Sequence, residues 1–348
     1  MASTVNHPFI SLLLPIRNEE NYIEACLKSL RAQDYPADRM EILVADGLST
    51  DNTRQIVSNW MKQDPRIRIY DNPKQIVPTG LNLLIPQAKG DILIRVDGHC
   101  VLASDYVSKC VRHLLEDGVD GVGGPMHSIG QDIISQVTAV AMSSKFGVGN
   151  SSFRTMQGKT MYVDSVPFPA YTREIIAKVG FYDEEMVRNQ DDEYNYRIRE
   201  AGGKLLLAAD VQSKYYSRGS IKKLWKQYFQ YGYWKVRVLQ KHPRQMSLRQ
   251  FVPPAFVASL IVSLIFALLI PIFWFIFAGI TGVYLFSNLL ASILSAANKD
   301  WQHLFLLPIV FAILHISYGL GFLVGLVKFA NRWNDKIGKV PPGKPFQA

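Results

Sequence analysis

The C-terminal part of the chain carries too little charge to form the surface of an ordinary soluble domain. Residues 251–348 contain six Lys or Arg and two Asp or Glu, and the stretch from Ala255 to Ala297 has no ionisable side chain except one tyrosine. Single domains usually hold about 100 to 200 residues, so a chain of 348 residues predicts one large domain and an appendage. A wholly soluble protein is excluded, and the appendage is predicted to enter a lipid bilayer.

The appendage divides into three apolar windows, Phe256–Ile276, Gly279–Ala297 and Leu304–Val327. Each is long enough to cross about 30 Å of hydrocarbon at about 1.5 Å per residue. Five basic residues follow the last window: Lys328, Arg332, Lys336, Lys339 and Lys344. The tendency of basic segments to stay in the cytoplasm would keep this tail on the side of the other basic residues, yet three full spans would place it opposite. Either one window, such as the first with its Pro271, is re-entrant or the tail is an exception.

The positive charge of the chain is concentrated just before the apolar part. Residues 1–210 carry 22 basic and 27 acidic side chains, whereas residues 211–250 carry ten basic and no acidic ones. Within this segment Ile221–Lys241 has a helical pattern, with Leu224, Tyr228, Tyr231 and Val238 on one face. We expect an interfacial helix whose basic side chains contact anionic membrane lipids, namely Lys222, Lys223, Lys226, Lys235 and Arg237. Lipid head groups suit this segment better than a nucleic acid, so no nucleic-acid partner is predicted.

The cysteines and the N-terminus indicate the compartment. Cys26, Cys100 and Cys110 have neither metal-binding spacing nor the pattern of a disulfide framework, so a reducing compartment is expected. The N-terminus lacks the basic start and long apolar run of a signal peptide. The large domain is therefore expected on the cytoplasmic side of an inner or plasma membrane, attached by several passes.

The first 210 residues alternate short apolar runs with amphipathic ones, which is the pattern of an α/β fold with a mostly parallel, doubly wound sheet. Strands are predicted at 9–15, 41–45, 67–71, 91–96 and 205–209, and helices at 21–33, 50–63, 78–88, 104–116 and 191–201. In such sheets ligands bind beyond the carboxyl ends of the strands. Polar residues follow three of these ends, so they are predicted to meet at one edge: Arg17, Asn18, Asp46, Asp97 and His99.

Asp46 and the pair Asp97 and His99 are the first candidates for chemistry. Asp46 follows a strand in VADGLSTD, where its carboxylate could accept a hydrogen bond from uracil N3–H or from guanine; the alternative is a solvated turn aspartate. Strand alternation would place Asp97 and His99 on one face, where they could bind Mn²⁺ or Mg²⁺ bridging a diphosphate. The alternative for this pair is a turn aspartate and a capping histidine.

A run of three acids, Asp191, Asp192 and Glu193, begins the last helix predicted before the basic segment. Such charges at a helix start are favoured by the helix dipole without any further role. The neighbouring Tyr194 and Tyr196 predict partial burial, however, and a half-buried carboxylate is suited to act as a general base. Crowding of like charges can also raise the pKa of one carboxyl group.

Five motifs, in this order, are similar to those of inverting family 2 glycosyltransferases with the GT-A fold. They are SLLLPIRNEE, VADGLSTD, NPKQIVPTGLNLLIPQAKGDILIRVDGH, VGFYDE and QDDEYNYRIREAGG. Within that family the chain most resembles the membrane-attached exopolysaccharide glucosyltransferases of the succinoglycan type. The resemblance covers about residues 8–245.

The resemblance implies a role for each matching position. The residues that would bind the nucleotide sugar are Pro15, Arg17, Glu19, Asp46 and Asp97. Asp97 and His99 would hold a divalent cation, Mn²⁺ or Mg²⁺, and Asp191 would be the catalytic base because it lies six residues before Arg197. The positions expected near the acceptor or behind the catalytic residues are Gln190, Asp192, Arg197, Gln227 and Tyr231.

Several positions depart from the family pattern. His99 stands where the metal motif usually has a second aspartate, Gln190 where a glutamate is common, and Glu193 where an aspartate is common. The QxxRW motif of processive members is reduced to QYFQY at 227–231, so its Arg and Trp are missing. We therefore expect addition of one sugar per encounter rather than synthesis and extrusion of a polymer.

The expected enzyme transfers one sugar with inversion from a nucleotide sugar, with UDP-glucose as the expected donor, to a lipid-linked glycan during polysaccharide biosynthesis. Two alternatives stay open: a polyprenyl-phosphate glycosyltransferase, whose acceptor is a bare lipid phosphate, and a non-catalytic membrane scaffold that binds nucleotide sugar. The predicted organisation is a GT-A domain at 1–215, basic interfacial helices at 216–250, two or three transmembrane helices at 251–330 and a basic tail at 331–348.

Overall fold

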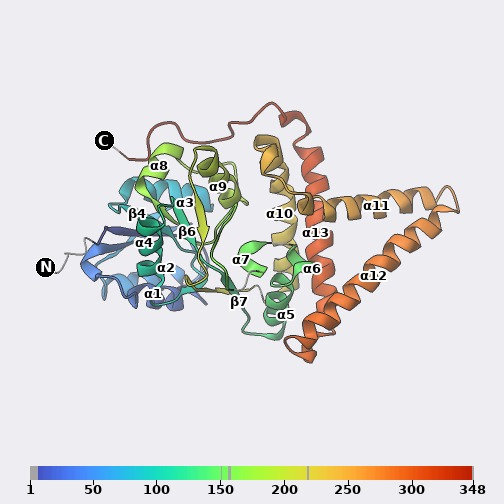
Figure 1. Ribbon diagram of the computed structural model, residues 1–348, viewed down its shortest axis with the longest axis horizontal. Coiled ribbons are helices and arrows are strands. Elements are labelled where there is room, and N and C mark those ends of the chain that lie inside the picture. Colours follow the sequence, from blue (N-terminus) through green and yellow to red (C-terminus); the bar gives the residue numbers. More distant parts are fainter. Residues whose placement is uncertain (1–6, 150, 156–157, 218, 347–348) are drawn as a thin grey trace. The chain divides into compact units, whose positions relative to one another are not determined.

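The computed structural model describes residues 7–149, 151–155, 158–217 and 219–346. The chain forms two compact units that are interleaved in sequence (Figure 1). Unit 1 comprises residues 1–127, 156–215 and 337–348, and unit 2 comprises residues 128–155 and 216–336. The described residues of 128–155 thus belong with the C-terminal helices, and residues 337–346 of the basic tail belong with unit 1. The predicted domain bounds stay a prediction.

Unit 1 is built on an eight-stranded sheet of order β3-β2-β1-β4-β9-β6-β10-β8. Its strands are β1 (Ile10–Ile16), β2 (Met40–Asp46), β3 (Ile67–Asp71), β4 (Ile92–Arg95), β6 (Gly121–Gly123), β8 (Met161–Tyr162), β9 (Ala170–Thr172) and β10 (Leu205–Leu207). β1 pairs in parallel with both β2 and β4, so Ile10 lies between Met40 and Ile92. The strand order therefore reverses at β1, and the carboxyl ends of β1 and β4 form the switch point where α/β sheets bind ligands.

The helices of unit 1 are α1 (Ile23–Arg31), α2 (Thr53–Met61), α3 (Val77–Leu84), α4 (Tyr106–Glu116), α8 (Arg173–Val179) and α9 (Gln190–Glu200). Their apolar faces and the buried strands form the core; α1, for example, buries Ile23, Cys26, Leu27 and Leu30. The predicted mostly parallel α/β fold is confirmed, with element bounds close to those predicted. β9 and β8 were not predicted, and both run antiparallel to their neighbours.

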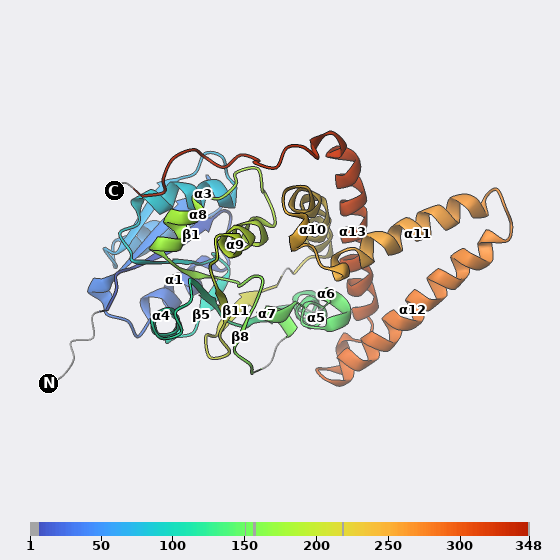
Figure 2. The same ribbon diagram turned by 45° about the horizontal axis from the view of Figure 1, so that its top comes forward.

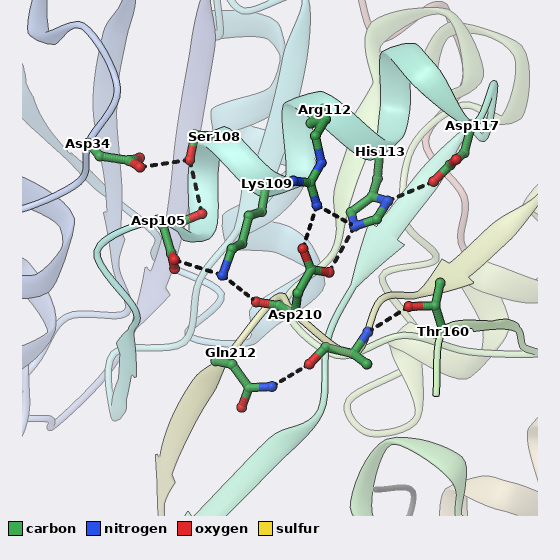
Figure 3. A network of polar contacts seen from close by, with 11 residues as sticks. Asp34, Asp105, Ser108, Lys109, Arg112, His113, Asp117, Thr160, Asp210 and Gln212 are labelled. Carbon is green, nitrogen blue, oxygen red and sulfur yellow. Dashed lines mark hydrogen bonds and ion pairs between the residues drawn. The ribbon is translucent and has the colours of Figure 1, made fainter. Parts of the chain in front are cut away.

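A smaller sheet has the order β5-β11-β7, from β5 (Cys100–Leu102), β11 (Ser213–Tyr216) and β7 (Met126–Ile129). The turn before β11 is fixed to α4 by Asp210 (Figure 3). The Asp210 carboxylate pairs with Arg112 at 2.5 Å and with Nε2 of His113 at 2.9 Å, while Lys109 donates to the Asp210 carbonyl at 2.9 Å. These contacts fix the turn that precedes β11 to α4.

Unit 2 consists of the helices α5 (Ile133–Met142), α6 (Lys145–Val148), α7 (Ser152–Thr155), α10 (Ile221–Lys241), α11 (Val252–Ala267), α12 (Phe273–Ala297) and α13 (Leu307–Lys328). α10 has the predicted bounds. Three helices of the described residues are long and apolar enough to cross a membrane: Leu248–Ala267, Phe273–Ala297 and Leu307–Lys328. The first apolar window, Phe256–Ile276, is interrupted at Pro271: α11 ends at Ala267, and Pro271 lies in the turn to α12.

The basic residues of α10 do not all face outward, as the expected lipid contacts require. Lys222, Lys223 and Lys226 are exposed, but Lys235 and Arg237 are buried within unit 2. For those two residues the predicted contact with lipid head groups is therefore wrong. The basic face that can contact a surface is confined to the first two turns of α10.

Candidate active site

The centre of the candidate site in unit 1 is Arg95, the last residue of β4, which contacts both Asp97 and Asp191. Its Nη2 donates to Asp97 Oδ1 at 2.9 Å, and its Nη1 pairs with Asp191 Oδ1. Only 6% of Arg95 is exposed. The buried Arg95 guanidinium thus connects two carboxylates. Asp97 is the one predicted to bind the metal ion and the nucleotide sugar, and Asp191 is the one predicted to act as base.

Asp191 lies in the first turn of α9, which follows Asn189 in the left-handed backbone conformation with φ 59°. The helix N-terminus favours a negative charge at this place. The Asp191 side chain is 39% exposed although one of its oxygens meets Arg95. A ligand can therefore reach this carboxylate while Arg95 keeps its orientation fixed.

The ion pair keeps both of its partners charged. Burial alone would raise the pKa of Asp97, but the positive charge of Arg95, with help from His99, outweighs it and lowers that pKa below its ordinary value. Burial likewise opposes the charge on Arg95, yet Asp97 raises the pKa of the guanidinium. Asp97 is thus an anion at neutral pH, which is the form that a metal ion requires.

His99 is not on a strand with Asp97, as the alternation argument assumed. β4 ends at Arg95, and both residues lie in the turn that leads into β5. Nδ1 of His99 is 2.8 Å from Glu19 Oε1, and the ring packs edge-on against Tyr215 at 4.8 Å between centroids. Nε2 of His99 is buried without a hydrogen-bond partner. The prediction that Asp97 and His99 share one face of a strand is therefore wrong. The His99 ring nevertheless has one nitrogen, Nε2, that makes no hydrogen bond.

Asp97 and His99 are the two residues predicted to hold a divalent cation. Among the residues that the structure describes, no group of three or more His, Cys, Asp or Glu side chains is arranged as a complete metal site. Asp97 supplies an ionised carboxylate, and His99 supplies an imidazole nitrogen that has no hydrogen-bond partner. They fit a cation that takes its remaining ligands from a diphosphate, as Mg²⁺ in nucleotide sites commonly does.

The predicted nucleoside pocket lies at the ends of β1 and β2. Asp46 is fully buried, so the alternative of a solvated turn aspartate is wrong. The Ser49 hydroxyl donates to Asp46 Oδ1 at 2.6 Å, and Arg54 Nη1 lies 3.1 Å from Asp46 Oδ2. Arg54 also pairs with Asp71, at the end of β3, at 2.5 Å. The role of Asp46 in nucleoside binding stays a prediction, and these contacts show how its carboxylate is held in place.

The remaining residues predicted for this pocket lie on β1 and the loop after it. Pro15 is buried in β1, and Arg17 follows as an exposed side chain beside Gly47, where an added Cβ would lie 3.2 Å from Arg17 Cβ. The Glu19 carboxylate contacts the His99 ring as described above, and the Glu19 backbone N–H donates to Thr53 Oγ1 at 2.7 Å. Glu19 therefore connects the β1 loop with the turn that carries His99.

Arg197, predicted behind the base, holds α9 in place. Its guanidinium pairs with Glu193 at 2.7 Å and donates to the carbonyls of Val179 at 3.0 Å and Phe181 at 2.9 Å. Glu193 is thus engaged by Arg197 one turn away. Gln190 is buried at the start of α9 and Asp192 is partly exposed, next to Asp191.

Gln227 and Tyr231, the two acceptor-side candidates of α10, belong to unit 2. Gln227 Nε2 donates to the Tyr231 hydroxyl at 2.8 Å, one helical turn away. The Gln227 side-chain oxygen is buried without a hydrogen-bond partner. Their contribution to acceptor binding stays a prediction.

Three residues of the site were not predicted from the sequence: Arg95, Ser49 and Arg54. A signal for Arg95 was present, because it is the one charge in the apolar run ILIRV and buried arginines are rare unless paired. Its partner Asp191 is far along the chain, however, so the pair itself could not be found from spacing. Ser49 and Arg54 lie within eight residues of Asp46 but resemble ordinary turn and helix-surface residues.

The sequence model of Glycosyl transferase family 2 matches residues 11–180. Succinoglycan biosynthesis protein ExoA of Rhizobium meliloti (strain 1021) is 31% identical over 324 residues, which cover 92% of this chain and 96% of that protein. The chain belongs to glycosyl transferase family 2 and is a glycosyltransferase.

A second relative is the dolichyl N-acetyl-alpha-D-glucosaminyl phosphate 3-beta-D-2,3-diacetamido-2,3-dideoxy-beta-D-glucuronosyltransferase of Methanococcus voltae. It is 29% identical over 332 residues, which cover 92% of this chain and 98% of that protein.

Solved structures show the same fold. The mannosyltransferase PcManGT from Pyrobaculum calidifontis, in complex with GDP-Man and Mn²⁺, has a TM-score of 0.57 at 17% identity, covering 92% of this chain and 88% of that chain. S. aureus TarS 1–349 in complex with UDP-GlcNAc has a TM-score of 0.51 at 15% identity, covering 93% and 92%. The GT-A fold expected from the motifs is confirmed.

Proposed function

We propose that this enzyme transfers a single sugar, with inversion, from a nucleotide sugar to a lipid-linked glycan at the cytoplasmic face of a membrane. UDP-glucose is the proposed donor and polysaccharide biosynthesis the proposed context. The observation that carries the proposal is the contact of Arg95 with both Asp97 and Asp191 at the switch point of the sheet. This arrangement puts a fixed, partly exposed carboxylate beside the residues proposed for the diphosphate.

Inversion needs a proton acceptor on the side of the sugar opposite to the leaving diphosphate. Asp191 Oδ1 meets Arg95, so Oδ2 is the oxygen proposed to take the proton of the acceptor hydroxyl. The hydroxyl oxygen then forms the bond to the anomeric carbon as the bond to the diphosphate breaks, and the diphosphate leaves with the electron pair. From an α-linked donor this gives a β-linked product.

A divalent cation, Mn²⁺ or Mg²⁺, would supply charge neutralisation for the leaving diphosphate when bound. Asp97 and His99 would hold it, since one is an ionised carboxylate and the other has an unbonded ring nitrogen. The complex of PcManGT with GDP-Man and Mn²⁺ supports this combination of donor and cation for the fold.

A hydroxyl group on a lipid-linked sugar is proposed as the acceptor. The name of the Methanococcus voltae relative describes transfer to a dolichyl-phosphate-linked sugar, and the ExoA name describes succinoglycan biosynthesis. The apolar helices of unit 2 support an acceptor that resides in a membrane. The missing Arg and Trp of the processive motif support one transfer per encounter.

The proposal is tested with the purified full-length protein in detergent, a panel of nucleotide sugars and a membrane lipid extract, followed by mass spectrometry of the lipids. A hexose mass added to a glycolipid, dependent on UDP-glucose, is the expected result. A hexose added to a bare polyprenyl phosphate would replace this function by the polyprenyl-phosphate one. No product and no donor hydrolysis with any donor would favour the scaffold alternative.

A further inference from the structure

The three long apolar helices of unit 2 differ in how much of each is covered by protein. Half of the most apolar part of α13 is buried within the protein, against 22% for the segment Leu248–Ala267 and 11% for α12. α12 exposes large apolar side chains along its length, such as Phe275 at 77% and Phe286 at 70%. A helix that is apolar all round is either a membrane span or the core of a protein, and these values separate α13 from the other two.

α13 lies alongside α10 (Figure 1), and the two helices run in the same direction, since Leu224 packs with Leu307 near both starts and Val236 packs with Phe322 near both ends. Figure 2 shows α11 and α12 as a hairpin that projects away from α13. The contact between α10 and α13 is backbone to backbone: a Cβ added at Gly232 would overlap the Tyr318 carbonyl oxygen, and one added at Gly321 would overlap that of Phe229. Glycine packing of this kind is common between membrane helices. The charges of α10 therefore decide where the pair can lie.

α10 cannot cross a bilayer. It carries Lys222, Lys223 and Lys226 near its start and Lys235, Arg237 and Lys241 near its end. The uncharged stretch between Lys226 and Lys235 is about 12 Å long at 1.5 Å per residue, against a hydrocarbon thickness of about 30 Å. Several of these charges would have to enter the hydrocarbon at a cost of about 2.5 to 3.5 kcal/mol each at the centre.

Both ends of α13 are fixed to helices of unit 2 that cannot cross a membrane, namely α5 and α10. Near its start, Leu307, Phe311 and Leu314 form one core with Val137 and Ala141 of α5 and with Leu224 of α10. α5 has ten residues and its chain leads from β7 to β8, so it can neither span a membrane nor remain on its far side.

At the other end of α13, the fully buried Arg237 donates to the Arg332 carbonyl at 3.2 Å and to the Asp335 carbonyl at 3.1 Å. Gln240 Nε2 donates to the Phe329 carbonyl at 2.7 Å. These donors of α10 satisfy carbonyl groups that follow the last turn of α13. The end of α13 is thus bonded to the basic end of α10.

The chain beyond α13 returns to unit 1. The Lys339 N–H donates to Asp183 Oδ1 at 2.8 Å, and the Glu184 N–H donates to the Lys339 carbonyl at 3.1 Å. Arg173 of α8 lies over the ring of Phe346, 3.7 Å from its centroid, and Figure 1 shows the tail beside α8. The tail and the catalytic unit are therefore on one side of the membrane.

We infer that α13 does not cross the membrane and that α11 and α12 alone enter it, as a hairpin whose two ends lie on the catalytic side. α13 is the core helix of unit 2, enclosed by α5, α10 and the base of the hairpin. The turn of the hairpin suits an apolar environment, because Leu269, Ile270 and Phe273 donate their N–H groups within it. Two passes also place the basic tail where the positive-inside tendency requires it.

Labelling of single cysteines with a membrane-impermeant maleimide, in intact cells and in inverted vesicles, tests this inference in the full-length protein. The sites are exposed positions: Lys62→Cys in unit 1, Lys299→Cys between α12 and α13, and Lys344→Cys in the tail. The wild-type chain is the background control, because Cys26, Cys100 and Cys110 are all buried. Each variant is first checked for a single symmetric peak in gel filtration.

The expected result is that all three cysteines react in inverted vesicles and none reacts in intact cells. Labelling of Lys344→Cys from the opposite side to Lys62→Cys would show three spans and overturn the inference. Labelling of Lys299→Cys alone from the opposite side would also overturn it, because α13 would then cross together with only one other helix. The labelling results do not depend on transferase activity, so a failure of this inference can be distinguished from a failure of the proposed function.

Discussion

Asp97 and Asp191 share one counter-ion: the Arg95 guanidinium meets both carboxylates from the end of β4. One of these carboxylates follows β4 at the switch point of the sheet, and the other lies in the first turn of α9. A change at Arg95 therefore affects the residue proposed for the metal and the residue proposed as base at once. Changes at either aspartate, in contrast, should separate the two roles.

Replacement of Asp191 by Asn should lower the rate of transfer by about 10² to 10⁴, the usual contribution of a general base. Nucleotide-sugar binding, measured by isothermal titration, should change little, because the residues proposed for it lie at or after the carboxyl ends of β1, β2 and β4. Asp192→Asn is the matched control and should have a much smaller effect. If Asp192 is the sensitive position, the base is assigned one residue too early; if neither matters, an ionised lipid phosphate is the better acceptor.

Chelation of divalent cations with EDTA should abolish transfer, and added Mn²⁺ or Mg²⁺ should restore it. Asp97→Ala should cost several kcal/mol of transition-state stabilisation, because the charge of the leaving diphosphate would be left without its proposed cation. Mn²⁺ binding can be followed directly by electron paramagnetic resonance in wild type and variant. Full turnover in EDTA would exclude the proposed metal.

Replacement of Arg95 by Lys should lower both stability and activity. An ammonium group lacks the planar fork with which the guanidinium meets two carboxylates, so one of them loses its partner. We expect a loss of about 1 to 3 kcal/mol, below the roughly 3 to 5 kcal/mol for complete removal of one partner of a buried pair. Thermal unfolding in detergent measures it, with the more exposed Arg199→Lys as control. Equal midpoints for wild type and Arg95→Lys would show that the shared contact adds no stability.

The three exposed lysines of α10 should mediate the response to anionic lipid. In nanodiscs the unfolding midpoint of the wild type should rise with the anionic lipid fraction, since each lysine near such a surface contributes about 1 kcal/mol. Joint replacement of Lys222, Lys223 and Lys226 by Gln should remove most of this rise. Joint replacement of exposed lysines of unit 1, Lys28, Lys62 and Lys89, is the matched control and should leave the rise unchanged.

The Asp210 cluster should contribute stability that depends on pH. Burial alone would raise the pKa of Asp210, but the hydrogen bonds with His113 and Arg112 lower it by more, so the net shift of the pKa is downward. A carboxyl whose pKa is lower in the folded state stabilises the fold above its unfolded pKa of about 3.9 and loses this effect as the pH falls through the folded value. Asp210→Asn should therefore lower stability at pH 7, and the gap to wild type should close below about pH 4. Because Asp210 is partly exposed, the gap should be about 1 kcal/mol or less. A gap that persists unchanged at low pH would show that shape, not charge, is responsible.

Much of unit 1 could be predicted because its signals are local. The apolar runs within β1, β2 and β4 are continuous in sequence, and the polar residues at their ends are adjacent to them in the chain. β9 has only three residues and was not found, since its pairing with β4 and β6 depends on contacts distant in sequence. The pair Arg95 and Asp191 was missed for the same reason.

Unit 2 shows what composition leaves undecided. α11, α12 and α13 have nearly the same apolar character, and each belongs to a helical segment long enough to cross a membrane. Length and hydropathy alone assign all three to a membrane. What separates α13 is the identity of its neighbours, and that information resides in the fold rather than in the helix itself.

The shared core of α5, α10 and α13 sets an order of events during synthesis. Val137 and Leu224 leave the ribosome well before Phe311, yet the three side chains form one cluster. The apolar faces of α5 and α10 therefore stay exposed until the hairpin of α11 and α12 and then α13 have been synthesised. A chain that stops before Leu307 would keep the strands of unit 1 and both hairpin helices but would present those faces to water, where a chaperone or protease can bind them. α13, which is translated late, thus completes unit 2, whose first helix, α5, is translated before α9. Loss of α13 should lower the amount of the protein in the cell.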